Sequence, residues 1–72
     1  MQHDDWSRMA ANVLKSELAR EGLDYEALIA RLAEHGIEES YKGIAAKINR
    51  GTFSFSFFLQ CMMALSKTEL RL

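Results

Sequence analysis

The sequence predicts an all-α fold, a compact bundle of four to five short helices with a central helix-turn-helix. Three observations predict it: apolar residues recur at helical spacing, proline is absent, and glycines divide the chain into helix-length segments at Gly22, Gly36 and Gly51. A chain of 72 residues holds one domain with one core, so residues 1–72 are treated as a single unit.

The first helix is expected to begin near Asp4 or Asp5 and to end at Gly22. A short carboxylate can accept hydrogen bonds from the free N–H groups of a first helical turn. Glycine readily adopts the left-handed conformation that ends a helix. Between these limits, the apolar residues at helical spacing are Trp6, Ala10, Val13, Leu14 and Leu18.

Two further helices are delimited in the same way. Asp24 is the expected cap of the second helix, which Gly36 closes, with Ile37 packing back onto it. The third helix starts near Glu39 or Ser40 and ends at Gly51. Their apolar stripes are Leu28, Ile29 and Leu32 in the second helix, and Tyr41, Ile44 and Ile48 in the third.

Residues 53–57 alternate phenylalanine and serine as a strand does, but a helix beginning at Ser54 is favoured. Ser54 can cap it, and Phe53 with Phe58 can form a hydrophobic staple across its first turn. The expected core side of this helix is Phe55, Phe58, Leu59, Met62 and Leu65. Its reverse side is apolar as well, so the helix is expected to be central or covered by a partner. The tail, residues 68–72, could be a short extended segment.

The predicted core combines one or more residues from every helix. Its expected members are Trp6, Leu14, Leu28, Leu32, Ile44, Ile48, Phe58 and Met62. Charge is distributed unevenly around this core. Residues 1–39 hold four Lys or Arg against nine Asp or Glu (−5), and residues 40–72 hold five against one (+4). A basic half gives some support for a nucleic-acid partner, although ordinary solvated helix surfaces explain the same asymmetry.

No arrangement of residues supports catalysis, so we expect that the protein is not an enzyme. His3 and His35 lie near helix ends, Cys61 has no evident base, and the adjacent carboxylates of Glu38 and Glu39 point in different directions. The same residues are too scattered to hold a metal, and no cofactor or small-molecule substrate is evident. A single cysteine, no signal peptide and no long apolar stretch predict a cytoplasmic protein without a membrane partner.

The strongest constellation of polar residues lies on the third helix. An α-helix fits the major groove of DNA, where asparagine can pair with adenine and arginine with guanine. Small residues permit close approach, and lysines can contact phosphates. The candidate DNA-binding residues are Ser40, Lys42, Gly43, Ala46, Lys47, Asn49 and Arg50. The alternative is a helical hairpin whose exposed face happens to be polar.

The middle of the chain resembles the helix-turn-helix of lambda-repressor-like regulators. The motifs that carry the resemblance are Leu28-Ile29-Ala30-Arg31-Leu32, Gly36-Ile37 and Ile44-Ala45-Ala46-Lys47-Ile48-Asn49-Arg50-Gly51, followed by a capped apolar helix ending Ala64-Leu65. The resemblance implies major-groove binding by the third helix. Tyr25 and Ser40 stand where that family usually has glutamine, and the Gly36–Gly51 stretch is longer by about one helical turn.

Most of the chain also resembles a family of short, uncharacterised bacterial proteins. The segments that carry this resemblance are Asn49-Arg50-Gly51-Thr52-Phe53-Ser54 and Phe57-Phe58-Leu59-Gln60-Cys61. The leading hypothesis is therefore a small regulator that binds double-stranded DNA. The alternative is a protein-interaction module that keeps the fold without binding DNA.

The apolar C-terminal third predicts a homodimer. One helix face covers an arc of little more than about 100°, so the remaining apolar side chains would be exposed on a monomer. The residues expected at the dimer interface are Phe55, Phe57, Cys61, Met63, Leu70 and Leu72.

Overall fold

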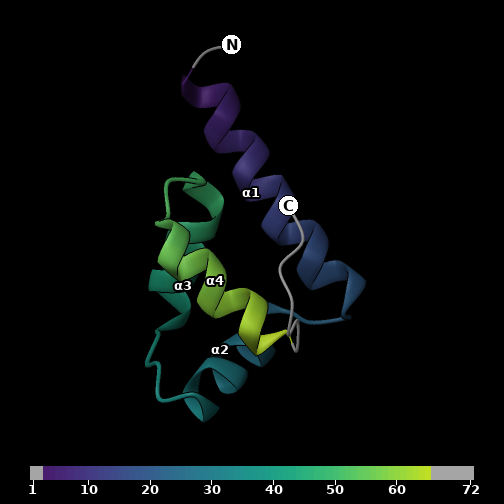
Figure 1. Ribbon diagram of the computed structural model, residues 1–72, viewed down its shortest axis with the longest axis vertical. Helices are drawn as coiled ribbons and strands as arrows, with labels where there is room; N and C mark the ends of the chain where they lie inside the picture. Colours follow the sequence, from purple (N-terminus) through teal and green to yellow (C-terminus); the bar gives the residue numbers. More distant parts are fainter. Residues whose placement is uncertain (1–2, 66–72) are drawn as a thin grey trace.

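The computed structural model describes residues 3–65, and every regular element in this range is an α-helix. The helices are α1 (His3–Arg20), α2 (Tyr25–Glu34), α3 (Tyr41–Arg50) and α4 (Phe55–Ala64) (Figure 1). The predicted all-α fold is confirmed. None of the helices in residues 3–65 is long and apolar enough to cross a membrane.

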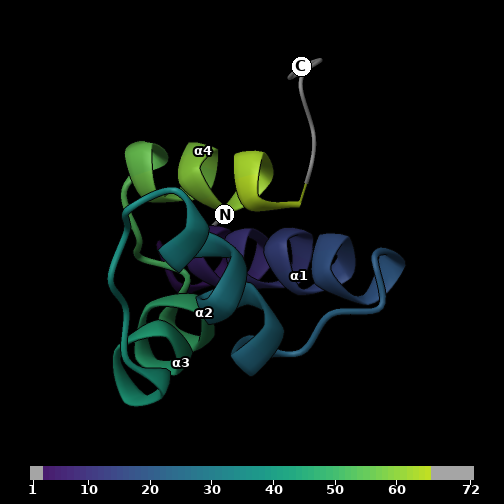
Figure 2. The same cartoon turned by 90° about the horizontal axis from the view of Figure 1, so that it is seen from below.

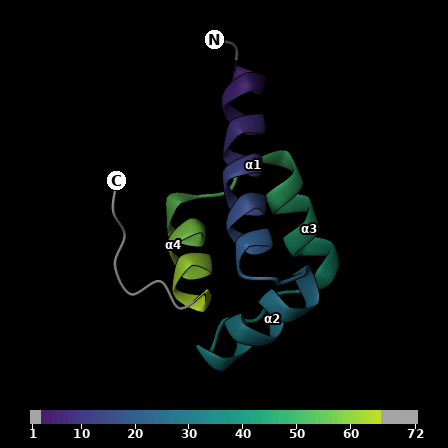
Figure 3. The same cartoon turned by 90° about the vertical axis from the view of Figure 1, so that its right-hand side faces the viewer.

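The helices α3 and α4 both lie to the left of α1 in Figure 1, and Lys47 of α3 contacts the Phe57 ring of α4. Views from below and from the side both place α4 on one side of α1 and α3 on the other, with α2 near the carboxyl end of α1 (Figures 2 and 3). α1 packs against α3, and α2 packs against both α3 and α4. Because α1 has 18 residues and the other helices have 10 each, its first turns extend beyond the rest of the bundle (Figure 3).

Side-chain caps fix where three of the helices begin. Asp24, Ser40 and Ser54 each accept a hydrogen bond from the backbone N–H three residues further on, at 2.8, 3.0 and 3.0 Å. These caps confirm the predicted starts of α2 and α4 and select Ser40 for α3. The expectation for α1 was wrong in detail, because Asp4 and Asp5 lie inside its first turn, where their charge suits the helix dipole.

Left-handed glycines end the first three helical segments as predicted, with φ of +69° at Gly22, +78° at Gly36 and +68° at Gly51. After Gly36 the N–H of Ile37 donates back to the carbonyl of Leu32 at 3.0 Å. Ile37 also packs against the core, as expected. Gly51 has a second constraint, since a Cβ there would overlap the carbonyl oxygen of Ser7 in α1. The end of α3 therefore touches the backbone of α1.

The core contains most of the residues that the apolar pattern predicts. Its predicted and confirmed members are Leu14, Leu28, Leu32, Ile44, Ile48 and Met62. Trp6 was placed wrongly: it is 58% exposed, because it lies beside the start of α4 on a side of α1 that the other described helices do not cover. Phe58 is half-buried, and its ring stacks on Phe53 at 6.5 Å between centroids, consistent with the predicted staple.

The helix α4 is rotated relative to the expectation. Its buried residues include Phe57 and Cys61, whereas Phe55 and Leu59 are exposed. Phe57 and Cys61 therefore belong to the core of the single chain, and assigning them to an exposed dimer interface was wrong. The reason is that α4 is apolar on nearly every face, so the spacing of its apolar residues does not define an inner side. Its polar residues do, because Ser56 and Gln60 lie four apart on the exposed face.

A side chain from α2 completes the far end of α4. The guanidinium of Arg31 donates to the carbonyl of Ala64 at 3.3 Å. A cation at this position satisfies one of the unpaired carbonyls of the last turn and suits the negative end of the helix dipole. Arg31 therefore joins α2 to α4.

Candidate nucleic-acid interface

The exposed face of α3 is centred on a small residue. Ile44 and Ile48 are fully buried, and Ala46 is half-buried on the opposite side of the helix. Around Ala46 lie exposed side chains that can donate hydrogen bonds. These are Lys42, Asn49 and Arg50. The structure therefore brings together four of the seven residues predicted for DNA binding, and we call these four the α3 face.

The charge on the α3 face is positive and is not neutralised by the rest of the fold. The helix Tyr41–Arg50 contains no acidic residue. Among residues 3–65, neither Lys42 nor Arg50 forms an ion pair with another side chain. Both cations are therefore available to an external anion.

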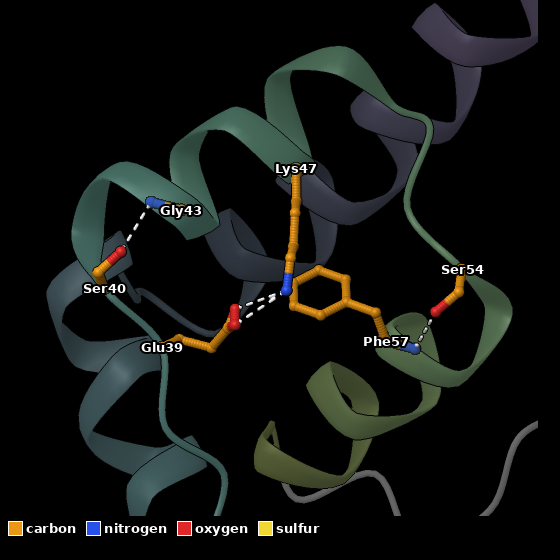
Figure 4. A network of polar contacts seen from close by, with 6 residues as sticks. All are labelled: Glu39, Ser40, Gly43, Lys47, Ser54 and Phe57. Atoms are coloured by element: carbon orange, nitrogen blue, oxygen red, sulfur yellow. Dashed lines mark hydrogen bonds and ion pairs between the residues drawn. The ribbon is translucent and has the colours of Figure 1, made fainter.

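Lys47 occupies a different position, on the flank of α3 that faces α4. Its Nζ donates to both carboxylate oxygens of Glu39, at 2.8 and 2.9 Å, and lies 4.9 Å from the centroid of the Phe57 ring (Figure 4). The Glu39 side chain is only 11% exposed. Lys47 thus links residues 35–40, α3 and α4, and a phosphate would have to compete with this contact. The same pair removes one of the two acidic charges that precede α3.

Asn49 is held by a residue from α2. The hydroxyl of Tyr25 donates to Oδ1 of Asn49 at 3.4 Å, and the Tyr25 ring contacts Tyr41 edge-on at 5.8 Å between centroids. Partial burial, with the nearby Tyr41 second, raises the pKa of Tyr25, so its hydroxyl remains a protonated donor. Sequence reasoning noted Tyr25 only as standing where a glutamine is usual. The signal in the sequence that could have indicated this contact is the position of Tyr25 at the start of α2, the helix that precedes α3 in the predicted helix-turn-helix.

Ser40 and Gly43 form the cap at the amino end of α3. Ser40 Oγ caps the helix by accepting from the N–H of Gly43 (Figure 4). A Cβ at position 43 would lie 2.9 Å from that same oxygen, so glycine leaves room for the cap. This contact gives Gly43 a role within the fold, besides the close approach to a ligand that its small size predicts.

A second candidate site is an apolar groove between α1 and the start of α4. It encloses about 420 Å³, and no charged side chain lines it. The lining residues are Trp6, Met9, Ala10, Val13, Phe53, Ser54, Phe55 and Phe58, and we call this the α1–α4 groove. Sequence reasoning missed the contribution of α1 because it placed Trp6 in the core.

The residues predicted for a dimer interface are thus dispersed. Phe55 lines the α1–α4 groove, and Met63 is exposed further along α4. Leu70 and Leu72 lie outside the described residues. Cys61 is fully buried, and its burial, together with the nearby carboxylate of Glu39, raises the pKa of its thiol to about 12, against the opposing effect of Lys47. The Cys61 thiol is therefore neutral at ordinary pH and is not a nucleophile there.

Comparison with known proteins gives one match. The profile of a family described as a domain of unknown function (DUF6471) matches residues 6–70, which include all of α2, α3 and α4. No curated protein and no solved structure matches the chain. The match supports the resemblance of the whole chain to a short, uncharacterised family. It gives no support to the resemblance of the segment from Leu28 to Leu65 to lambda-repressor-like regulators. Because the match covers most of the chain, this protein belongs to the DUF6471 family.

Proposed function

We propose that this protein binds double-stranded DNA through the α3 face and acts as a small transcriptional regulator. The observation that carries the proposal is the composition of that face. A short, capped helix exposes Lys42, Asn49 and Arg50 around the small side chain of Ala46, with no acidic residue among them. The resemblance of the middle of the chain to lambda-repressor-like regulators supports the same function.

The side chains of the α3 face suit the edges of base pairs. An α-helix enters the major groove, and a small central residue lets the helix approach the bases closely. Asn49 can pair with adenine N6 and N7, and Arg50 with guanine O6 and N7. Lys42, one turn from Ala46, is placed to contact a backbone phosphate.

A shallow depression beside the α3 face offers a place for a phosphate. It has a volume of about 290 Å³ and is lined by Lys47, Arg50, Thr52, Phe53, Ser54 and Phe57. Two of these residues are cationic, none is acidic, and the amino end of α4 begins at Ser54. Free N–H groups and the helix dipole favour an anion at such an end. The ion pair of Lys47 with Glu39 keeps one carboxylate from repelling it.

The test starts with selection of binding sites from a randomised duplex pool. Fluorescence anisotropy then measures affinity for the selected site at several salt concentrations. Arg50→Ala is expected to weaken binding by about 1–3 kcal/mol and to relax the preference at one base pair. Lys42→Ala should weaken binding to all sequences and reduce the salt dependence by about one phosphate contact.

The matched control is Arg20→Ala, which removes the same charge at the carboxyl end of α1. It should leave affinity for the selected site unchanged. The proposal is wrong if the wild-type protein shows no salt-dependent binding to any duplex at low ionic strength. It is also wrong if Arg20→Ala weakens binding as much as Arg50→Ala does, because the binding would then follow net charge alone.

A second candidate function is a protein-interaction module without DNA binding. The specific observation in its favour is the α1–α4 groove, whose exposed apolar residues suit a protein partner. Under this alternative, substitutions on the α3 face leave the protein's binding unchanged.

A further inference from the structure

We propose that the α1–α4 groove is the docking site of a second copy of this chain, which makes the protein a homodimer. The groove is apolar, about 420 Å³ in volume and free of charged side chains. This proposal does not depend on DNA binding, because no residue of the α3 face lines the groove, although Phe53 and Ser54 line both the groove and the depression beside the α3 face.

The groove remains open within residues 3–65. α1 packs more closely against α3 than against α4, and several apolar side chains between α1 and α4 stay exposed. Trp6 is 58% exposed and Phe55 is 59% exposed, and Met9 and Val13 are also exposed, at 44% and 46%. The largest apolar patch on a typical soluble monomer covers about 300–600 Å² and is often functional.

The exposed apolar area is what a homodimer of standard size requires. A stable interface buries about 800 Å² on each partner, of which about 65% is apolar in homodimers, or roughly 500 Å². Taking aromatic side chains as about 150–250 Å² each, the exposed parts of the groove residues amount to roughly 500 Å². Tryptophan, phenylalanine and methionine, which supply most of this area, are the residues enriched in interface cores.

The shape and the charges of the groove fit a second copy of the chain. A two-fold interface uses the same patch on both subunits, so the patch must be complementary to itself. Trp6 and Phe55 are the most exposed large apolar side chains lining the groove, so a two-fold contact would set Trp6 of one copy against Phe55 of the other. Asp5 and Arg8, which lie nearby on α1, have opposite signs and pair at 3.8 Å, so two copies would not repel one another there.

A dimer formed through this surface would leave the α3 face exposed. α4, which supplies one wall of the groove, lies on the other side of α1 from α3 in both views (Figures 2 and 3). A DNA-binding dimer contacts two half-sites, and the exposed α3 face of each copy would supply one contact.

The test is sedimentation equilibrium from micromolar to submillimolar concentration. Phe55→Asp and Trp6→Glu are expected to raise the dissociation constant of the dimer at least about thirtyfold, because each places a charge in a buried hot spot. Both acids lie near the amino end of a helix, which the dipole favours, so the monomers should keep their helical circular dichroism. The matched control is Met63→Lys, on the same helix as Phe55 and equally exposed, which should leave the dimer intact.

Two further measurements test which residues form the interface and whether residues 66–72 occupy the groove instead. Isotope-filtered NMR of a mixed labelled and unlabelled sample should show contacts from Trp6 of one copy to Phe55 or Phe58 of the other, and their absence from a dimer would overturn the proposal. A chain ending at Leu65 tests residues 66–72 as the occupant. The proposal is overturned if the full chain is monomeric at every concentration; if the shortened chain then dimerises, residues 66–72 are the occupant of the groove. It is also overturned if Met63→Lys alone dissociates the dimer. Failure of DNA binding would leave all of these results unaffected.

Discussion

The α3 face and the α1–α4 groove are both exposed within residues 3–65, but the helices that form them differ in how many of their apolar side chains the core buries. In α3, two isoleucines fill the core and the charged residues and Asn49 are exposed, so the helix has one inner side and one outer side; Tyr41, which was expected on the apolar stripe, is exposed as well. In α1 and α4, apolar residues outnumber the positions that the core can accept, and the excess is left in the groove. A domain of this size hides only about 60% of its unfolded surface, so apolar excess of this kind needs a partner. The comparison separates a polar, basic surface from an apolar one.

The largest expected effect comes from removing the core that supports both surfaces. Leu32→Ala or Ile48→Ala should lower the free energy of unfolding by about 2–5 kcal/mol, because each side chain is fully buried at the junction of the helices. Urea unfolding followed by circular dichroism measures the change. Leu59→Ala, at an exposed position of α4, is the control and should cost less than about 1 kcal/mol. Equal losses in core and control variants would show that the helical faces are misplaced.

A smaller effect tests the contact between α1 and α3 that holds the two surfaces in place. Gly36→Ala should cost about 1–2 kcal/mol, since it adds only the strain of a left-handed residue in open space. Gly51→Ala should cost about 2–4 kcal/mol, because its Cβ must also displace the Ser7 carbonyl. The difference between the two thermal or urea transitions measures the close approach alone. Identical transitions would contradict the contact of Gly51 with α1.

The smallest expected effect is confined to the α3 face. Tyr25→Phe removes the hydroxyl that holds Asn49 Oδ1, so it should reduce the preference for adenine at one position of the selected DNA by about five- to tenfold. Stability and the dimer dissociation constant should not change beyond about 0.5 kcal/mol. Parallel binding-site selections with both proteins measure the preference. An unchanged profile, with wild-type binding intact, would show that Tyr25 does not position Asn49.

Much of the fold could be predicted from local signals. The caps at Asp24 and Ser54 and the glycine ends at Gly22, Gly36 and Gly51 depend on a few neighbouring residues, and all of them are confirmed. The division of α3 into a buried and a polar side also follows from its sequence, because its apolar and polar residues alternate with the helical period. These features require no knowledge of how the helices pack.

The features that could not be predicted depend on packing between distant segments. The spacing of the apolar residues does not define the inner side of α4. The exposure of Trp6 depends on how α1 and the start of α4 lie beside one another, with an open groove between them. The bond between Tyr25 and Asn49 joins residues 24 positions apart, and nothing in either local sequence specifies it. The pairing of Lys47 with Glu39 likewise could not be predicted without knowing the path of the backbone through residues 35–40.

The bond from Arg31 to the end of α4 has a consequence for the order of folding. α4 contains no charged residue, and its last turn is completed by a side chain 33 positions earlier in the chain. A ten-residue helix is marginal in isolation, so α4 should acquire stable structure only after α2 is in place to receive it. Amide protons of α2 and α4 should therefore exchange with solvent as one cooperative unit, while the first turns of α1 exchange independently.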